Sequence, residues 1–360
     1  MDSGLMIVAL LVAFGNGAND NFKGFATVWG SNTLSYPRAL QLATVATVAG
    51  SLVSVYLATA LVQSFSGKGL VSAEIVHTSS FMFEVAAGAG ATVLLATRLG
   101  FPVSTTHALI GGLIGAGLGQ PGGGVNWGPL LHTFLYPLLL SPIVAAAISL
   151  VLQLGIKWRS PENDCACVVV SEPATGLLTN GSLVQQRSMS SVELMVAPQV
   201  VCEQIGPQIL FSSSRFFDHL HALSAMSICF ARAVNDTPKL AALLLVTPGT
   251  GAQSAVMMVT GMMATGGLLF AKKVAVTMSQ RMTRLDPVPG LMANMTTAMI
   301  VLFASNFGFP VSTTHVAVGS IAGIGAGAQS LDRKVLQGIL LSWVATLPMA
   351  GAIAFLLARF

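Results

Sequence analysis

The residues best placed to do chemistry are the hydroxyl side chains of an octapeptide that occurs twice. Residues 100–107 and residues 308–315 both read Gly-Phe-Pro-Val-Ser-Thr-Thr-His. The glycine suits the left-handed end of one helix, and the proline suits the first turn of the next. The hydroxyls then fall at a helix N-terminus, where backbone N–H groups lack partners and the dipole is positive. Because anions bind at such ends, we expect a small oxyanion at Ser104, Thr105, Thr106, Ser312, Thr313 and Thr314.

A single copy of this octapeptide could be an ordinary helix cap and kink. Two identical copies favour a site in which two helix N-termini face each other near the membrane centre. Such a site would enclose a tetrahedral anion, phosphate or sulfate. His107 and His315 end the two copies. Each histidine either shares a proton with the anion or holds backbone carbonyls of its own hairpin.

Two Asn-Asp pairs, Asn19-Asp20 and Asn235-Asp236, lie in otherwise apolar segments. A charged residue at the centre of a membrane helix costs about 2.5–3.5 kcal/mol, so each aspartate is a functional candidate. Nearby glycine and proline residues predict that both helices are broken and expose carbonyl groups. Carboxylate, amide and carbonyl oxygens are the donors that hard cations prefer. We therefore predict a Na⁺ site at these four residues.

A lysine follows each aspartate by three residues, Lys23 in the first copy and Lys239 in the second. Each lysine either pairs with its aspartate along the helix or points at the anion. Glu84 is a further accessory candidate near the first octapeptide, without a counterpart near the second.

The composition excludes a water-soluble protein. Of the 360 residues, 53% are hydrophobic and 8% are charged, whereas a soluble domain carries about 25% charged residues. Several apolar runs approach the ~20 residues that span a bilayer as a helix. We expect an all-α polytopic membrane protein whose first apolar run is a retained helix rather than a signal peptide. The net charge of +4 does not indicate a nucleic-acid partner, because membrane proteins concentrate basic residues in cytoplasmic loops.

The repeated motifs divide the chain into residues 1–155, a first transmembrane repeat, and residues 216–360, a second one. Downstream of each octapeptide, glycines also match, as at Gly111 and Gly319. Residues 156–215 are less hydrophobic and predict a water-exposed linker, a plain connector with a short amphipathic piece at 192–201. The four cysteines, Cys165, Cys167, Cys202 and Cys229, lack metal-site spacing, and we expect free thiols.

Basic residues indicate the orientation of the repeats. If the linker is cytoplasmic, 11 of the 17 Lys and Arg residues also face the cytoplasm: Arg38, Lys157, Arg159, Arg187, Arg215, Lys272, Lys273, Arg281, Arg284, Arg333 and Lys334. This agrees with the positive-inside rule. It places the N-terminus outside and gives the repeats opposite orientations, as in secondary transporters.

These motifs together resemble the PiT family of inorganic phosphate transporters. The resemblance rests on Gly17-Ala-Asn-Asp20, on Asn235-Asp236 and on the two octapeptides, and it covers nearly all of the chain outside the linker. It implies an inverted repeat with two re-entrant hairpins, often a homodimer, in the plasma membrane. It also implies import of phosphate driven by Na⁺ or H⁺, without a further cofactor. Many members read Asn-Asp-Val-Ala-Asn where this chain reads Asn-Asp-Asn-Phe-Lys; we expect Na⁺, with H⁺ as the alternative.

Other functions are compatible with parts of the pattern. A sulfate permease of the same architecture would use the same hydroxyls. An anion channel would need a continuous pore rather than a site between mirrored halves. An intramembrane hydrolase using Ser104 and His107 would need a third orienting group, which does not occur at matching positions of the two copies.

Overall fold

A computed structural model describes residues 2–57, 61–62, 65–67, 69–76, 78–121, 123–155, 165–171, 191–204, 208–282 and 285–360. Within this part of the chain, 7 helices are long and apolar enough to cross a membrane. Four of the basic residues expected to face the cytoplasm lie outside the described residues: Lys157, Arg159, Arg187 and Arg284. The chain divides into two compact units, Met1–Lys157 with His221–Phe360, and Trp158–Leu220.

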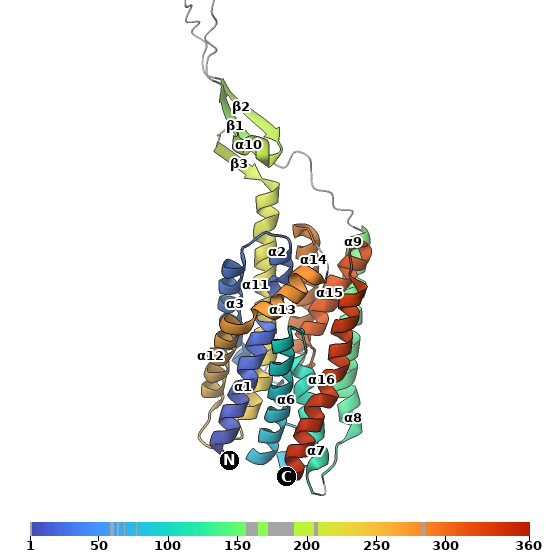
Figure 1. Cartoon of the computed structure of the whole chain (residues 1–360). Helices are drawn as coiled ribbons and strands as arrows, with labels where there is room; N and C mark the ends of the chain where they lie inside the picture. Colours follow the sequence, from blue (N-terminus) through green and yellow to red (C-terminus); the bar gives the residue numbers. More distant parts are fainter. Residues whose placement is uncertain are drawn as a thin grey trace, which may run out of the picture. The chain divides into compact units, whose positions relative to one another are not determined.

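The first unit contains the helices of both repeats (Figure 1). The elements up to the linker are α1 (Asp2–Asp20), η1 (Lys23–Phe25), α2 (Ala26–Gly30), α3 (Tyr36–Leu57), α5 (Ala73–Val76), α6 (Ser79–Leu99), α7 (Thr105–Gly119), α8 (Trp127–Pro129), η2 (Leu130–Leu135) and α9 (Tyr136–Gly155). Those after the linker are α11 (Ser213–Leu244), which belongs to this unit from His221 onwards, α12 (Ala252–Phe270), α13 (Lys272–Val276), η3 (Thr277–Arg281), α14 (Pro287–Asn306), α15 (Thr313–Gly327) and α16 (Arg333–Arg359). Both chain termini lie at one end of this unit, and α9 runs towards the other end (Figure 1).

Each octapeptide joins two helices as its sequence predicts. Gly100 has φ 81° and Gly308 has φ 72°, the left-handed conformation that glycine adopts without strain. Ser104 is the N-cap of α7, and its Oγ accepts from the backbone N–H of His107 over 3.1 Å. Ser312 caps α15 in the same way, over 3.2 Å to the N–H of His315. The prediction of a helix start at the hydroxyls is confirmed in both copies.

The helices after the octapeptides pack closely on the last helix of the opposite repeat: α7 on α16, and α15 on α9. A Cβ atom at Gly111 would lie 2.2 Å from the carbonyl oxygen of Leu347, and one at Gly319 would lie 2.4 Å from that of Pro142. Small residues let membrane helices approach to this degree. The matching glycines of the two repeats therefore mark matching helix contacts.

The predicted helix break is right for the first Asn-Asp pair and wrong for the second. α1 ends at Asp20, and the chain continues into the short helix η1. In contrast, α11 runs from Ser213 to Leu244 without interruption, with Pro238 inside it. Proline removes one backbone N–H, and a membrane helix tolerates this where neighbouring groups satisfy the freed carbonyl.

The second unit is a folded element rather than a plain connector. It contains β1 (Cys165–Ser171), β2 (Ser191–Ala197), α10 (Gln199–Gln204) and β3 (Gln208–Ser212). The strands form an antiparallel sheet in the order β2-β1-β3, with Cys165 opposite Ala197 on one side and Ser212 on the other. The segment 192–201, predicted to be amphipathic, is mostly strand because its alternating residues pair with β1.

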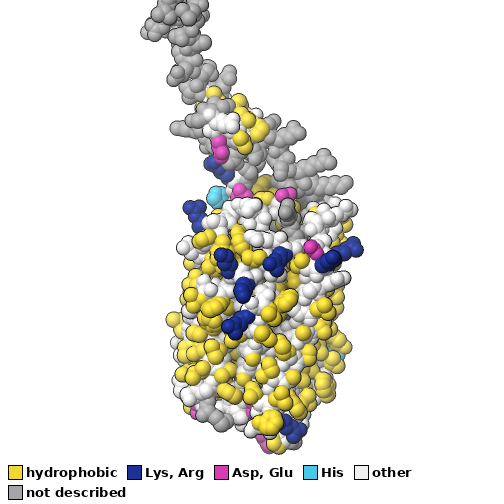
Figure 2. All heavy atoms as spheres, viewed as in Figure 1, with side chains coloured by type: hydrophobic (Ala, Val, Ile, Leu, Met, Phe, Trp, Pro, Cys, Tyr) yellow, Lys and Arg dark blue, Asp and Glu magenta, His cyan; other side chains and the backbone are white. Residues whose placement is uncertain are grey.

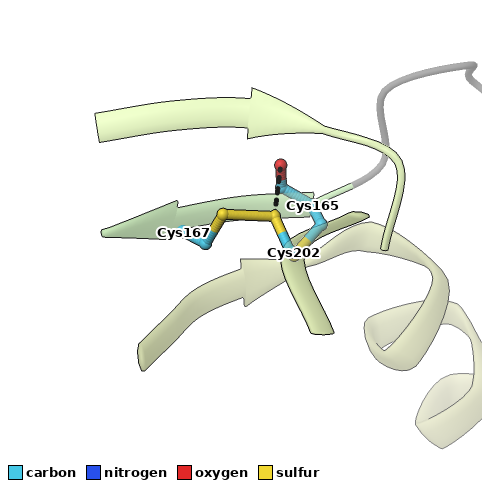
Figure 3. The surroundings of a disulfide bond; sticks show 3 residues. All are labelled: Cys165, Cys167 and Cys202. Atoms are coloured by element: carbon cyan, nitrogen blue, oxygen red, sulfur yellow. Dashed lines mark hydrogen bonds between the residues drawn. A yellow bond between two sulfur atoms is a disulfide. The ribbon is translucent and has the colours of Figure 1, made fainter. Parts of the chain in front are cut away.

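Cysteine side chains form much of the core of this unit. Cys167 and Cys202 form a disulfide that ties β1 to α10 (Figure 3). The Sγ of Cys202 also lies 3.9 Å from the carbonyl oxygen of Cys165. The expectation of free thiols is therefore wrong for Cys167 and Cys202, and right for Cys165 and Cys229. Cys167 and Cys202 are 35 residues apart in the sequence. Their pairing was not predictable from spacing, because only the fold brings β1 and α10 together.

Candidate functional site

The two octapeptides meet inside the first unit. The hydroxyl of Thr314 donates to the carbonyl oxygen of Val103 over 2.9 Å, and the hydroxyl of Thr106 donates to that of Val311 over 3.5 Å. Each copy thus offers its third hydroxyl to the valine carbonyl of the other. The convergence of the two octapeptides is therefore present in the structure.

All six hydroxyl side chains of the octapeptides are buried. Their exposed fractions lie between 1% and 5%: Ser104, Thr105, Thr106, Ser312, Thr313 and Thr314. A buried hydroxyl needs a hydrogen-bond partner, which can be protein or ligand. Two helix N-termini with these hydroxyls form an environment suited to a small anion.

The asparagines of the Asn-Asp pairs hold the hairpins in place. Asn19 donates to the hydroxyl of Thr97 over 2.9 Å and to the carbonyl of Phe101 over 3.0 Å, and it accepts from the N–H of Val103 over 3.1 Å. Asn235 donates to the hydroxyl of Ser305 over 2.7 Å. These contacts position the octapeptides. That Asn19 and Asn235 bind a cation stays a prediction.

Both lysines pair with their aspartates and also reach the octapeptides. Lys23 forms an ion pair with Asp20, and its Nζ lies 2.5 Å from the hydroxyl of Thr314. The Nζ of Lys239 lies 3.4 Å from Asp236 and 2.8 Å from the hydroxyl of Thr106. Each ammonium group contacts its carboxylate and a hydroxyl of the opposite repeat's octapeptide. The pairing with aspartate is therefore present in the structure, whereas contact of the lysines with the anion stays a prediction.

Asn16 joins the two carboxylates, although it is not among the site residues predicted from the sequence. Its side-chain nitrogen lies 3.2 Å from an oxygen of Asp20, 3.2 Å from an oxygen of Asp236 and 3.0 Å from the hydroxyl of Thr105. One amide therefore connects the two repeats and the first octapeptide. The spacing was a usable signal, because residues four apart share a helix face and Asn16 precedes Asp20 by four.

Arg232 is a second site residue that was not predicted from the sequence. It precedes Asp236 by four residues, as Asn16 precedes Asp20. Its guanidinium donates to Asn16 over 3.0 Å and to Thr47 over 2.8 Å, and it lies 4.0 Å from the carboxylate of Asp236. Arg232 is 1% exposed. The site thus contains two carboxylates and three basic side chains, so its formal charge favours an anion.

The two histidines stand at the base of the octapeptides. Their rings lie 4.3 Å apart between centroids. His107 contacts the hydroxyl of Ser104 over 3.0 Å, and His315 stacks on Trp343 with a centroid distance of 3.6 Å. Trp343 in turn donates to the carbonyl of Pro102 over 3.1 Å. These contacts give the histidines a packing role, and proton sharing with the anion stays a prediction.

Glu84 lies away from the octapeptide tips. It accepts from Ser80 over 3.0 Å and from Gln120 over 2.8 Å. Glu84 precedes the end of α6 by 15 residues, which corresponds to about 22 Å of helix. The structure therefore does not bring Glu84 together with the other predicted site residues.

A cavity of about 1000 Å³ lies beside the first octapeptide. Its lining includes Thr97 and Gly100, and four basic side chains: Arg98, Lys272, Lys273 and Arg281. Lys and Arg side chains gather on this face near α13, above a mainly hydrophobic surface (Figure 2). Thr97 is also the partner of Asn19, so the cavity reaches the residues that hold the first octapeptide.

The fold and the site define a polytopic membrane transporter, since a buried site with convergent polar groups lies between helices of two repeats. Residues 16–354 match the phosphate transporter family. The chain belongs to this family, and it functions as a phosphate transporter rather than an enzyme.

The relatives carry corresponding names. A putative phosphate permease of Pyrococcus horikoshii is 26% identical over 97% of this chain and 96% of the relative. A probable low-affinity inorganic phosphate transporter of Mycobacterium leprae is 27% identical over 97% of this chain and 75% of the relative. A solved structure, titled the sodium-dependent phosphate transporter, has a TM-score of 0.75 and 21% identity, and the match covers 99% of this chain and 98% of that one.

Proposed function

We propose that this chain imports inorganic phosphate by alternating access and holds the anion between the two octapeptides. The observation that carries the proposal is the crossing of the octapeptide tips, in which Thr106 and Thr314 reach carbonyls of the opposite copy. Phosphate would be bound by Ser104, Thr105, Thr106, Ser312, Thr313 and Thr314, with first-turn backbone N–H groups of α7 and α15 as further donors.

Burial supports a mechanism with moving halves. Because the hydroxyls are at most 5% exposed, phosphate enters only when the repeats separate on one side. Contacts between matching residues, as between His107 and His315, are expected near a twofold axis that relates the two repeats. Rocking of one repeat against the other about such an axis would open the site to each side in turn.

The basic cavity is the proposed route on the cytoplasmic side. Its four basic side chains would raise the local concentration of a divalent or monovalent anion. The positive-inside rule favours the cytoplasmic face for three of them, Lys272, Lys273 and Arg281, on and near α13. Phosphate released from the octapeptides would pass Thr97 and Gly100 into this cavity.

A cation gradient is the proposed energy source, with Na⁺ and H⁺ as the two candidates. The solved relative is called sodium-dependent, and the carboxylates of Asp20 and Asp236 are oxygen donors suited to Na⁺. Two carboxylates beside an anion also require positive charge in their surroundings.

The proposal also covers the location, the orientation and the assembly of the chain. We propose the plasma membrane, an external N-terminus, a cytoplasmic linker and a homodimer. Large exposed apolar side chains such as Leu139, Ile143 and Val151 on α9 are available to lipid or to a second copy. Light scattering of the detergent-solubilised chain measures the oligomeric state, and a monomeric mass would reject the dimer.

Uptake of radiolabelled phosphate into proteoliposomes tests the function. We expect saturable uptake that an imposed Na⁺ or H⁺ gradient accelerates. Excess sulfate distinguishes the runner-up function, because a sulfate permease would lose phosphate uptake in its presence. Flux that fails to saturate with phosphate would indicate a channel and reject the proposal.

A further inference from the structure

The ammonium group of Lys23 lies in a shell of protein oxygens. It donates to the carboxylate of Asp20, to the carbonyl oxygen of Val103 over 2.9 Å, and to the hydroxyl of Thr314 over 2.5 Å. A lysine ammonium has three N–H donors, and three oxygens receive them. Lys23 is 4% exposed, so water does not compete for these contacts over most of its surface.

Lys239 has the corresponding shell in the second repeat. Its ammonium contacts the carboxylate of Asp236 over 3.4 Å, the carbonyl oxygen of Val311 over 3.1 Å and the hydroxyl of Thr106 over 2.8 Å. It also donates to the side-chain oxygen of Asn235. Lys239 is 1% exposed.

The two shells share three matching oxygens. Each contains the aspartate of the same repeat, the valine carbonyl of the same repeat's octapeptide, and the third hydroxyl of the opposite octapeptide; the shell of Lys239 also contains the side-chain oxygen of Asn235. Carboxylate, carbonyl and hydroxyl oxygens are the ligands that a hard metal cation would select. A Na⁺ ion that entered either shell would have to displace a cation covalently attached to the chain.

We propose that Lys23 and Lys239 are built-in cations that occupy both cation positions beside the anion, so that phosphate binding and transport by this chain do not use Na⁺. The inference rests on the proposed function and decides between its two coupling ions. Protons then remain as the coupling ion. The lysines also join each aspartate to both octapeptides, so the anion site is assembled before any ion arrives.

The remaining charge of the site supports this assignment. The two ammonium groups balance the two carboxylates, and Arg232 adds one further positive charge. The guanidinium Nε of Arg232 has no hydrogen-bond partner among the described residues, although the side chain is buried. A buried donor without a partner is unfavourable unless a ligand satisfies it. The site therefore has an excess of positive charge for phosphate without a bound metal ion.

Binding of radioactive Na⁺ to the purified full-length protein tests the inference without relying on transport. We expect no saturable Na⁺ binding by the unaltered chain, with or without phosphate. Lys23→Ala and Lys239→Ala each vacate one shell while its oxygens remain, and we expect saturable Na⁺ binding to appear in each variant. Lys334→Ala, which changes an exposed lysine at the start of α16, is the control and should bind no Na⁺.

Saturable Na⁺ binding by the unaltered chain would overturn the inference, even if neither lysine variant folds. Transport gives a second measurement. The unaltered chain should take up phosphate at the same rate in sodium and in choline medium, whereas acceleration by sodium would overturn the inference. Absence of phosphate uptake in every medium would reject the proposed function instead, and the Na⁺-binding measurement would still decide the part played by the lysines.

Discussion

The guanidinium of Arg232 donates to the side-chain oxygen of Asn16 over 3.0 Å, and the two residues hold matching positions in the two repeats. Each precedes the aspartate of its Asn-Asp pair by four residues. Through its nitrogen, Asn16 then reaches both Asp20 and Asp236. One pair of matching residues therefore connects the charged groups of the site and relates the two repeats to each other.

Loss of the carboxylate of Asp236 should strongly reduce transport. Asp236→Asn leaves the ammonium of Lys239 buried without its counter-charge, and breaking a buried ion pair in this way costs about 3–5 kcal/mol. We expect phosphate uptake to fall by at least about tenfold and the unfolding temperature to fall. Asp286→Asn, at an exposed aspartate before α14, should change neither measurement. Normal uptake by Asp236→Asn would contradict the proposed site.

Removing the hydroxyls that cross between octapeptides should weaken phosphate binding. Thr106→Val and Thr314→Val keep the side-chain shape but remove a buried hydrogen-bonding group, which costs about 1–3 kcal/mol. We expect the KM for phosphate to rise by about tenfold, which corresponds to about 1.4 kcal/mol. Thr265→Val, at an exposed threonine of α12, is the matched control. An unchanged KM in both octapeptide variants would place the anion elsewhere.

Alanine at the helix-contact glycines should destabilise the transmembrane unit. At Gly111 the new Cβ would lie 2.2 Å from the carbonyl oxygen of Leu347, so α7 and α16 must separate. Gly261 in α12 has no atom within 4 Å of the corresponding position, and alanine there should stabilise the helix by up to about 1 kcal/mol. Thermal unfolding in detergent should therefore shift in opposite directions for Gly111→Ala and Gly261→Ala. An unchanged or raised unfolding temperature of Gly111→Ala would contradict the close contact between α7 and α16.

Charge removal in the basic cavity should slow phosphate capture from one side. Lys272→Ala and Lys273→Ala remove positive charge from the cavity lining, and this attraction is screened at high salt. We expect a raised KM at low ionic strength and a smaller difference at high ionic strength. The effect should occur only for phosphate supplied from the cytoplasmic side. An equal effect from both sides would contradict the proposed route.

The disulfide should stabilise the linker unit without affecting transport. Cys202→Ser breaks the link to Cys167 across 35 residues, and a loop of this length contributes about 3–4 kcal/mol. We expect faster proteolysis of residues 165–212 and unchanged phosphate uptake. Cys165→Ala keeps the disulfide and serves as the comparison. Cytosolic thiols reduce most disulfides. Alkylation of Cys167 in intact cells would therefore indicate a linker on the cytoplasmic side, and absence of alkylation would indicate the external side.

The sequence by itself determined the local structure of the octapeptides and the class of the protein. Glycine, proline and serine have conformational and capping preferences that act within a few residues, so the left-handed turn at Gly100 and the N-cap at Ser104 were predictable. The apolar runs similarly determined a helical membrane protein, because only satisfied backbone structures cross a bilayer.

The tertiary structure decided what these local elements contact. Three features depend on neighbours distant in the sequence. They are the disulfide between Cys167 and Cys202, the packing of α9 and α16 on helices of the opposite repeat, and the continuous helix through Pro238. The same holds for Lys23 and Lys239, whose shells combine an aspartate of one repeat with a hydroxyl of the other. Spacing along a helix gave each aspartate–lysine pair as one of two alternatives, but a shell drawn from both repeats exists only once the two octapeptides have packed together.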